Sequence, residues 1–342
     1  MTSYPRKRFY TLDIARALAI ILVAIGHFDV EPMPVFYKNL HDIIYTFHMP
    51  LFMFVSGFLA MTTMRSVSYA EFIKKKFYRL IVPYFVVSII ILIIKLLSES
   101  KLNVDHPVVP LDFIEIIWLP KAGAFLWFIF ALWWLMVLIP IFNTPKKRLL
   151  LLIIAIPLHF CSGMVTEYFC FDKMAYFAIY FASGTIMSDI LRKIPIKQIC
   201  LVSFFTFPVL TGIIVSENIE IFGLSNVLSS IFYLITAFSG IGSSITISNA
   251  IERYGHNKIK KVLFSISGAS YIIYLFHTTF MGFAKSILVK FKFFTTGNLF
   301  EHYTIAEFIV PILFGVVIPY FIFKFLDRYK ITQKIFGLYR WK

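Results

Sequence analysis

The first hydrophobic stretch of the chain runs from Arg8 to Val30 and is apolar enough to span a bilayer, yet it carries Asp13, Arg16 and His27. A helix advances about 100° and 1.5 Å per residue, so Arg16 and His27 project from nearly the same face, about 16 Å apart along the axis. Asp13 falls on that face, about one turn before Arg16. Polar residues in lipid are costly and by default face a cavity or a substrate path. The stripe is therefore the first candidate for chemistry.

The same stripe has a simpler interpretation. Arg16 lies near the start of the stretch, where arginine often snorkels to the headgroups. His27 lies near the other end, where an imidazole can sit at the membrane interface. Periodicity favours the functional interpretation and leaves this one open.

The composition indicates an all-α membrane protein. Of the 342 residues 59% are hydrophobic and 15% are charged, and the apolar residues form long runs. These runs predict a polytopic bundle of transmembrane helices, and they are too long for the alternating strands of an outer-membrane barrel. The first stretch lacks a small-residue cleavage site and is followed by further spans, so no cleavable signal peptide is expected.

Hydropathy predicts ten spans within a single domain that covers residues 1–342. The predicted spans are residues 10–29, 42–62, 80–97, 123–142, 148–161, 174–190, 199–216, 224–248, 264–287 and 305–326. The fifth is short, which suits a tilted or partly re-entrant segment. No appended soluble domain is expected, so the bundle itself must carry the chemistry.

The loops between the predicted spans alternate in charge. One set, which includes Lys146, Lys147 and Arg148 and the tail after Arg328, holds roughly 23 basic residues against roughly 6 in the other. The positive-inside rule therefore places both termini in the cytoplasm. Arg16 then lies toward the cytoplasm and His27 toward the outer face. The net charge of +15 is explained by topology, and no nucleic-acid partner is expected.

The three cysteines do not form a metal-binding pattern. Cys161 and Cys170 share one predicted loop, and Cys200 lies in a predicted span. If the loop is external, a disulfide between Cys161 and Cys170 is one alternative. Two unpaired thiols are the other.

The second predicted span contains Pro50, which removes a backbone hydrogen bond and is expected to kink the helix. Ser56 and Gly57 favour close helix approach. The first two spans are antiparallel with a short connection, so His48 and His27 are expected at similar depth. The alternative for His48 is an imidazole that simply bonds a neighbouring backbone carbonyl.

A basic amphipathic stretch leads into the third span, where Lys76 and Arg79 are three residues apart and share a helical face. Arg16 is expected at the same membrane level. Three cations at one level suit a phosphate-bearing ligand. The alternative is an ordinary positive-inside cluster that contacts anionic membrane lipid.

Several of these residues carry a family resemblance. Arg16 and His27, separated by ten residues, together with Phe47–Phe58, resemble the first two spans of the acyltransferase-3 family of integral membrane acyltransferases, and of its fucose 4-O-acetylase-like branch in particular. Lys76 and Arg79 followed by Pro83 resemble that family's R-x-x-R element, with lysine in place of the first arginine. Residues 270–277, SYIIYLFH, are similar to its late S-x-x-I-Y-L-x-H element, which ends at His277.

The resemblance implies O-acetylation in the bacterial cytoplasmic membrane. Acetyl-CoA is then the acyl-donor substrate, no cofactor or metal is bound permanently, and a sugar hydroxyl of a surface glycan or its lipid-linked precursor is the acceptor. Arg16, Lys76 and Arg79 would hold the nucleotide phosphates. His27 would act as general base or carry the acyl group covalently. Asp13 would pair with Arg16, with His48 and His277 in supporting roles.

Two other classes of protein fit the hydropathy pattern. A secondary transporter or glycan flippase also has about ten spans with polar stripes, and a non-enzymatic assembly subunit is polytopic too. An acyltransferase in which His27 is replaced by alanine should keep its fold and lose acyl transfer. In a transporter the same change should leave acetylation of the product untouched.

Overall fold

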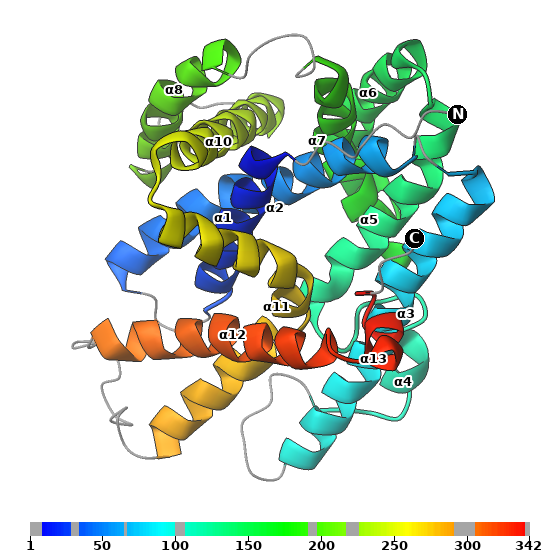
Figure 1. Ribbon diagram of the computed structural model, residues 1–342, viewed down its shortest axis with the longest axis vertical. Helices are drawn as coiled ribbons and strands as arrows, with labels where there is room; N and C mark the ends of the chain where they lie inside the picture. Colours follow the sequence, from blue (N-terminus) through cyan, green and yellow to red (C-terminus); the bar gives the residue numbers. More distant parts are fainter. Residues whose placement is uncertain are drawn as a thin grey trace. The chain divides into compact units, whose positions relative to one another are not determined.

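The computed structural model describes residues 9–28, 34–64, 67–99, 107–190, 197–216, 226–290 and 305–338 (Figure 1). In these ranges the regular structure is helical and no strand occurs. The longer helices are α1 (Tyr10–Gly26), α2 (Val35–Met64), α3 (Tyr69–Ser98), α5 (Trp127–Leu138), α6 (Pro145–Phe160), α7 (Phe171–Ile190), α8 (Lys197–Val215), α10 (Asn226–Tyr254), α11 (Asn257–Lys290) and α12 (Ile305–Leu326). Two short α-helices, α4 (Asp112–Glu115) and α13 (Lys330–Ile335), and four short 3-10 helices complete the described elements. The 3-10 helices are Ala124–Leu126, Ile139–Phe142, Ser162–Met164 and Tyr168–Cys170.

The all-helical class is confirmed, and each predicted span overlaps one of the longer helices. Six described segments are long and apolar enough to cross a membrane. They are Val35–Met64, Tyr69–Ser98, Ala124–Phe142, Val227–Tyr254, Asn257–Leu288 and Phe308–Leu326. Helix α1 has 17 residues and α6 has 16, at or below the usual length of a full span. The number ten and the side of the termini stay predictions.

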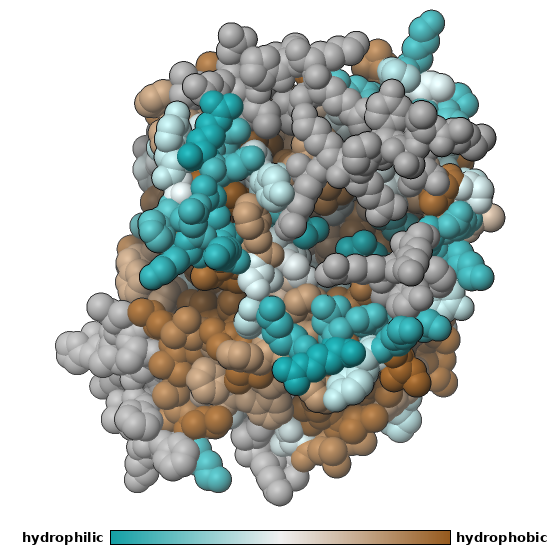
Figure 2. Space-filling view, in the orientation of Figure 1, coloured by the Kyte–Doolittle hydropathy of each residue, from teal (hydrophilic) through white to brown (hydrophobic). Residues whose placement is uncertain are grey.

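Helix α12 exposes a continuous apolar stripe. Every fourth residue along one face is an exposed hydrophobic side chain, namely Ile309, Leu313, Val317, Phe321 and Phe325. Figure 2 shows hydrophobic colouring over the middle of α12. A stripe of this length on a water-soluble protein would drive association. On a membrane protein it is the surface that contacts lipid.

The chain divides into two compact units. The first unit comprises Met1–Ser66, Thr144–Leu152 and Tyr180–Ser270, and the second comprises Val67–Asn143, Ile153–Ile179 and Tyr271–Lys342. Helices α6, α7 and α11 each contribute residues to both units.

In the first unit, α1 and α2 pack against each other and against α10, while α8 lies beside α10 (Figure 1). The α8–α10 contact is partly polar, because the Ser243 hydroxyl donates to the Ser203 carbonyl oxygen at 2.8 Å. Arg148, 2% exposed, forms an ion pair with Asp189. Arg148, which its sequence position predicted to be a loop cation, is therefore buried. Removing one partner of a buried pair leaves an uncompensated charge, which is strongly destabilising.

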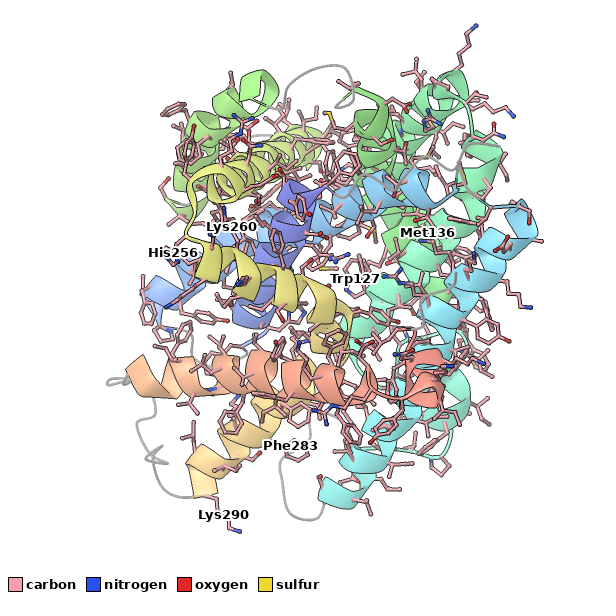
Figure 3. All side chains as sticks on the ribbon, in the orientation of Figure 1. Trp127, Met136, His256, Lys260, Phe283 and Lys290 are labelled. Carbon is pink, nitrogen blue, oxygen red and sulfur yellow. The ribbon has the colours of Figure 1, made fainter. Side chains whose placement is uncertain are left out.

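In the second unit, α5 packs on α3. Side chains of these two helices donate hydrogen bonds to backbone carbonyls of the connecting segments. The Tyr84 hydroxyl donates to the Ile116 carbonyl oxygen at 2.8 Å. The Trp134 indole N–H donates to the Phe169 carbonyl oxygen at 3.1 Å. These bonds satisfy loop carbonyls that have no partner in regular structure. Figure 3 labels Trp127 and Met136 on the same helix, α5.

Helices α2 and α7 cross at two glycines in the first unit. A methyl group built on Gly57 would lie 2.1 Å from the Phe181 carbonyl oxygen, and one built on Gly184 would lie 2.0 Å from the Phe54 carbonyl oxygen. Each helix thus presses its backbone into the gap left by the other's missing side chain, as small residues allow at membrane helix contacts. The close approach expected at Gly57 is confirmed.

We expect Gly57→Ala and Gly184→Ala each to lower the thermal unfolding midpoint of the purified protein. The added methyl group meets backbone on the opposing helix, and such overpacking costs about 1–3 kcal/mol. The midpoint should be measured in one detergent for all variants.

Gly212→Ala in α8 is the matched control, because nothing lies within 4 Å of a methyl group built there. Alanine is the better helix former by about 0.5–1 kcal/mol, so this variant should be as stable as the parent or more stable. An unchanged midpoint for both Gly57→Ala and Gly184→Ala would contradict the crossing described here.

Candidate active site

His27 ends helix α1, and its backbone and side chain share one acceptor. The backbone N–H donates to the Val23 carbonyl oxygen at 3.0 Å, and Nδ1 of the ring lies 3.0 Å from the same oxygen. A carbonyl oxygen can only accept, so Nδ1 carries the proton in this bond. The lone pair of the neutral imidazole is then on Nε2, which is the nitrogen that can act as a base.

Tyr37, near the start of α2, holds the polypeptide around His27. Its hydroxyl lies 2.7 Å from the Ile25 carbonyl oxygen and 2.6 Å from the Phe28 carbonyl oxygen. The last carbonyls of a helix have no partner within the helix. A buried hydroxyl that serves them fixes the turn that carries the imidazole, and Tyr37 is 1% exposed.

His48 on α2 lies beside His27, with the two ring centroids 6.2 Å apart. Its Nδ1 donates to the Ile44 carbonyl oxygen at 2.7 Å, so its lone pair is also on Nε2. That Nε2 is buried and has no hydrogen-bond partner among the described residues. An unsatisfied buried polar atom costs about 1–3 kcal/mol, so a bonded carbonyl alone does not account for His48.

Two further aromatic side chains of α2 join these histidines. The Tyr45 ring stacks on His41 with centroids 4.0 Å apart, and it contacts His48 at 4.9 Å and His27 at 6.0 Å. Sequence reasoning missed both Tyr45 and His41. The available signal was their spacing with His48, at positions that share one helical face.

Arg16 is held from two helices of the first unit. Its Nη2 lies 3.4 Å from Asp13 Oδ1, and its Nε donates to the Ser267 hydroxyl oxygen on α11 at 3.1 Å. The pairing expected between Asp13 and Arg16 is therefore present. The Arg16 side chain is 24% exposed.

The beginning of α1 is tied to the corner between α10 and α11. The Thr11 hydroxyl bonds the Glu252 carboxylate, and the Lys260 ammonium donates to the Glu252 backbone carbonyl at 3.3 Å. Figure 3 labels Lys260 and His256 at this corner. These contacts fix the first turn of the helix that carries Arg16 and His27.

Lys76 and Arg79 belong to the second unit, on α3. The Lys76 ammonium lies 5.2 Å from the centre of the Phe72 ring, a cation–π contact. Arg79 is exposed, and its backbone oxygen lies against Gly337, where a methyl group would come within 2.4 Å. Gly337 follows α13 with a positive φ of 66°, and the Leu338 N–H donates to the Gln333 carbonyl oxygen at 2.7 Å. This is a Schellman helix end, for which glycine is favoured.

His277 lies buried in the second unit. Its Nδ1 donates to the Tyr274 carbonyl oxygen at 2.8 Å, and its ring contacts Phe125 at 5.2 Å between centroids. The Tyr271 hydroxyl, six residues earlier on the same helix, donates to the Leu80 carbonyl oxygen at 3.2 Å. The late sequence element thus anchors α11 to α3. A catalytic support role for His277 stays a prediction.

Cys161 and Cys170 are both free thiols. Burial raises the pKa of Cys170 to about 12, so this thiol stays protonated and is a poor nucleophile at neutral pH. Among the described residues, no cluster of three histidine, cysteine or acidic side chains is placed to hold a metal ion.

The first unit brings together His27, His48, Tyr45 and His41, and the same α1 helix carries Arg16 below them. This arrangement offers a base with a fixed tautomer, a second imidazole with an unsatisfied nitrogen, and an aromatic surface beside them. Lys76, Arg79 and His277 lie in the second unit.

Comparison with known proteins identifies similarity to acyltransferases. A family model described as an acyltransferase domain matches residues 9–324. The nodulation protein NolL of Sinorhizobium fredii is similar over 84 residues at 34% identity, which is 22% of this chain and 22% of that protein. No solved structure matches the chain. Because the family model spans nearly all of the described helices, including those that carry His27, Arg16, Lys76 and His277, this chain belongs to the acyltransferase-3 family.

Proposed function

We propose that this protein is an O-acyltransferase of the bacterial cytoplasmic membrane. It moves an acetyl group from cytoplasmic acetyl-CoA to a hydroxyl of a surface polysaccharide or of its lipid-linked precursor. The single observation that carries the proposal is the geometry of His27 in an acyltransferase chain, where the bond from Nδ1 to Val23 leaves the basic lone pair on Nε2.

The proposed step is a direct transfer. The acceptor hydroxyl oxygen attacks the thioester carbonyl while Nε2 of His27 takes the hydroxyl proton. The new C–O bond forms, the C–S bond breaks, and the proton on His27 passes to the departing CoA sulfur. The imidazole thus serves first as base and then as acid, and it ends each cycle neutral.

The donor is held by its phosphates. Arg16, Lys76 and Arg79 supply the cations in this proposal, because charge-assisted bonds to phosphate are strong. Support for Arg16 comes from its fixed direction, which Asp13 and Ser267 set from two sides. Support for Lys76 comes from its contact with an aromatic ring, that of Phe72. The adjacent Lys75, by contrast, forms an ion pair with the Glu71 carboxylate.

A transporter or glycan flippase is the alternative that hydropathy left open. Membership of an acyltransferase family favours the enzyme, and so does an imidazole whose tautomer is set by the helix end on which it sits.

We expect His27→Ala to abolish acetylation of the product while the protein still inserts and accumulates. Losing a positioned general base typically costs about 10²–10⁴ in rate. Acetyl esters on surface glycans should be measured by mass spectrometry in cells that carry either the parent or the variant, with protein amounts compared by immunoblot.

His159→Gln is the matched control. His159 also donates from Nδ1 to a backbone carbonyl, that of Tyr176 at 2.7 Å, but it lies in the second unit outside the proposed machinery. This variant should keep near-normal acetylation at equal expression. A well-expressed His27→Ala protein with near-normal acetylation would remove His27 from the mechanism.

We expect alanine substitution of Arg16, Lys76 or Arg79 to weaken acetyl-CoA binding by about 1.5–3 kcal/mol each. Arg16→Ala should be the most severe, and Arg16→Lys should rescue only in part, because a point charge does not reproduce the guanidinium fork. Lys76→Arg should be tolerated. The measurement is CoA affinity of the purified protein by calorimetry.

Lys75→Ala serves as the control, since Lys75 is already paired with Glu71. It should bind CoA like the parent. If the three alanine variants also bind like the parent, these cations determine topology only, and the donor site must be sought elsewhere, beginning with the basic stretch from Arg253 to Lys261.

We also propose ten spans with both termini in the cytoplasm, since basic residues dominate alternate loops. Reporter fusions made after residues 100 and 220 should give the signal of the outer side. A cytoplasmic signal from either fusion would show that the topology is wrong.

A further inference from the structure

Four side chains form a stripe along one face of the first half of α2. They are Tyr37, His41, Tyr45 and His48, at spacings of four, four and three residues that keep them on one side of a helix. Their rings follow one another in contact, with centroids 6.2 Å apart for the first pair, 4.0 Å for the second and 4.9 Å for the third. Tyr45 and His48 also contact His27, with centroids 6.0 Å and 6.2 Å from the His27 ring.

Exposure along this stripe is uneven. Tyr37 and His48, at the two ends, are 1% and 2% exposed, whereas Tyr45 between them is 46% exposed. Asp42, whose carboxylate lies 3.1 Å from Nδ1 of His41, has a side chain that is 40% exposed. A half-exposed aromatic ring therefore lies beside the buried His48 and the partly buried His27, and the exposed Asp42 carboxylate is close by.

The opposing helix makes room for this ring. A methyl group built on Gly26, the last residue of α1, would lie only 3.2 Å from the Tyr45 ring and 3.2 Å from the Ile44 side chain. A side chain at this position would require the Tyr45 ring and the Ile44 side chain to shift by a few tenths of an ångström. The missing side chain of Gly26 thus allows the ring to lie against the end of α1.

The second observation is the unsatisfied nitrogen of His48. Its Nε2 is buried, holds a lone pair, and lacks a partner among the described residues. A buried acceptor of this kind is normally satisfied by protein, water or ligand. The chemical group that suits it is a hydroxyl donor, which is also the group that the proposed reaction acylates.

We propose that one surface of α2 binds the pyranose ring of the acceptor sugar. This surface, the Tyr45 platform, consists of His41, Asp42 and Tyr45. The C–H groups of the sugar pack on the exposed part of the Tyr45 ring that His41 leaves uncovered, one ring hydroxyl donates to Asp42, and a second hydroxyl is directed toward Nε2 of His48, next to His27. This inference rests on the proposed acyl transfer and adds the place and class of its acceptor.

The chemistry of the platform separates the two substrates. The phosphates of CoA are anionic and would be repelled by the Asp42 carboxylate, whereas sugar hydroxyls are donors that a carboxylate accepts. An aromatic face with a few well-placed polar groups at its edge is the usual make-up of a site for a neutral organic ligand. The platform thus fits the acceptor and disfavours the donor.

The test compares a ring-shaped acceptor with an acyclic one. Purified protein is supplied with acetyl-CoA and with methyl α-L-fucopyranoside, methyl α-D-galactopyranoside, methyl α-D-glucopyranoside or glycerol, and the KM of each acceptor is measured. Tyr45→Ala should raise the KM of the best pyranoside by about tenfold and leave the KM of glycerol and of acetyl-CoA unchanged. Tyr45→Phe should stay close to the parent, because it keeps the ring.

Tyr233→Ala is the control, since Tyr233 on α10 is exposed to a similar extent, 41%, and lies outside the stripe. A second readout needs no turnover: saturation-transfer NMR should detect methyl pyranoside on the parent and on Tyr233→Ala, and lose it on Tyr45→Ala. Equal pyranoside KM and equal NMR signal in Tyr45→Ala and the parent would overturn the platform and leave acyl transfer intact. Pyranoside binding that depends on Tyr45, without acetyl transfer to any acceptor, would overturn the acyl-transfer proposal and retain the sugar site.

Discussion

The end of helix α1 is the feature on which the candidate site depends. The last carbonyls of any helix lack partners within it, and in a membrane such groups are costly. Here the Val23 carbonyl accepts both the backbone and the ring N–H of His27. The Tyr37 hydroxyl lies within hydrogen-bond distance of the Ile25 and Phe28 carbonyl oxygens and can donate to either one. The need to satisfy the backbone therefore also fixes the tautomer and direction of the imidazole.

Much of the fold follows from hydropathy, and the departures have a common cause. The predicted span 305–326 coincides with α12, whereas the spans predicted at 42–62 and 80–97 are parts of α2 and α3, which begin seven and eleven residues earlier. Hydropathy measures transfer into lipid and does not detect a polar extension of the same helix. For α3 a local signal existed, because Ser68 accepts from the Glu71 N–H at 3.3 Å as in a helix-capping box.

The geometry of the candidate site was predictable where its residues belong to one helix. Periodicity identified His27, Arg16 and the Asp13 pairing, since these depend only on the geometry of α1. It did not identify the Tyr45 platform, because the stack over His27 depends on how α2 meets the end of α1. The prediction for Arg148 was wrong for the same reason. Its place in a basic run indicated a loop, but it is buried beside Asp189, a partner that is distant in sequence.

The central claim is that the His27 imidazole serves as the base for acyl transfer to a hydroxyl. The most direct measurement follows the acetyl group of isotopically labelled acetyl-CoA in a single turnover with purified protein and a methyl pyranoside. The parent should move the label into an alkali-labile sugar ester, and His27→Gln should bind CoA equally well and leave the label on it. Label transfer by His27→Gln at the parent's rate would contradict the account.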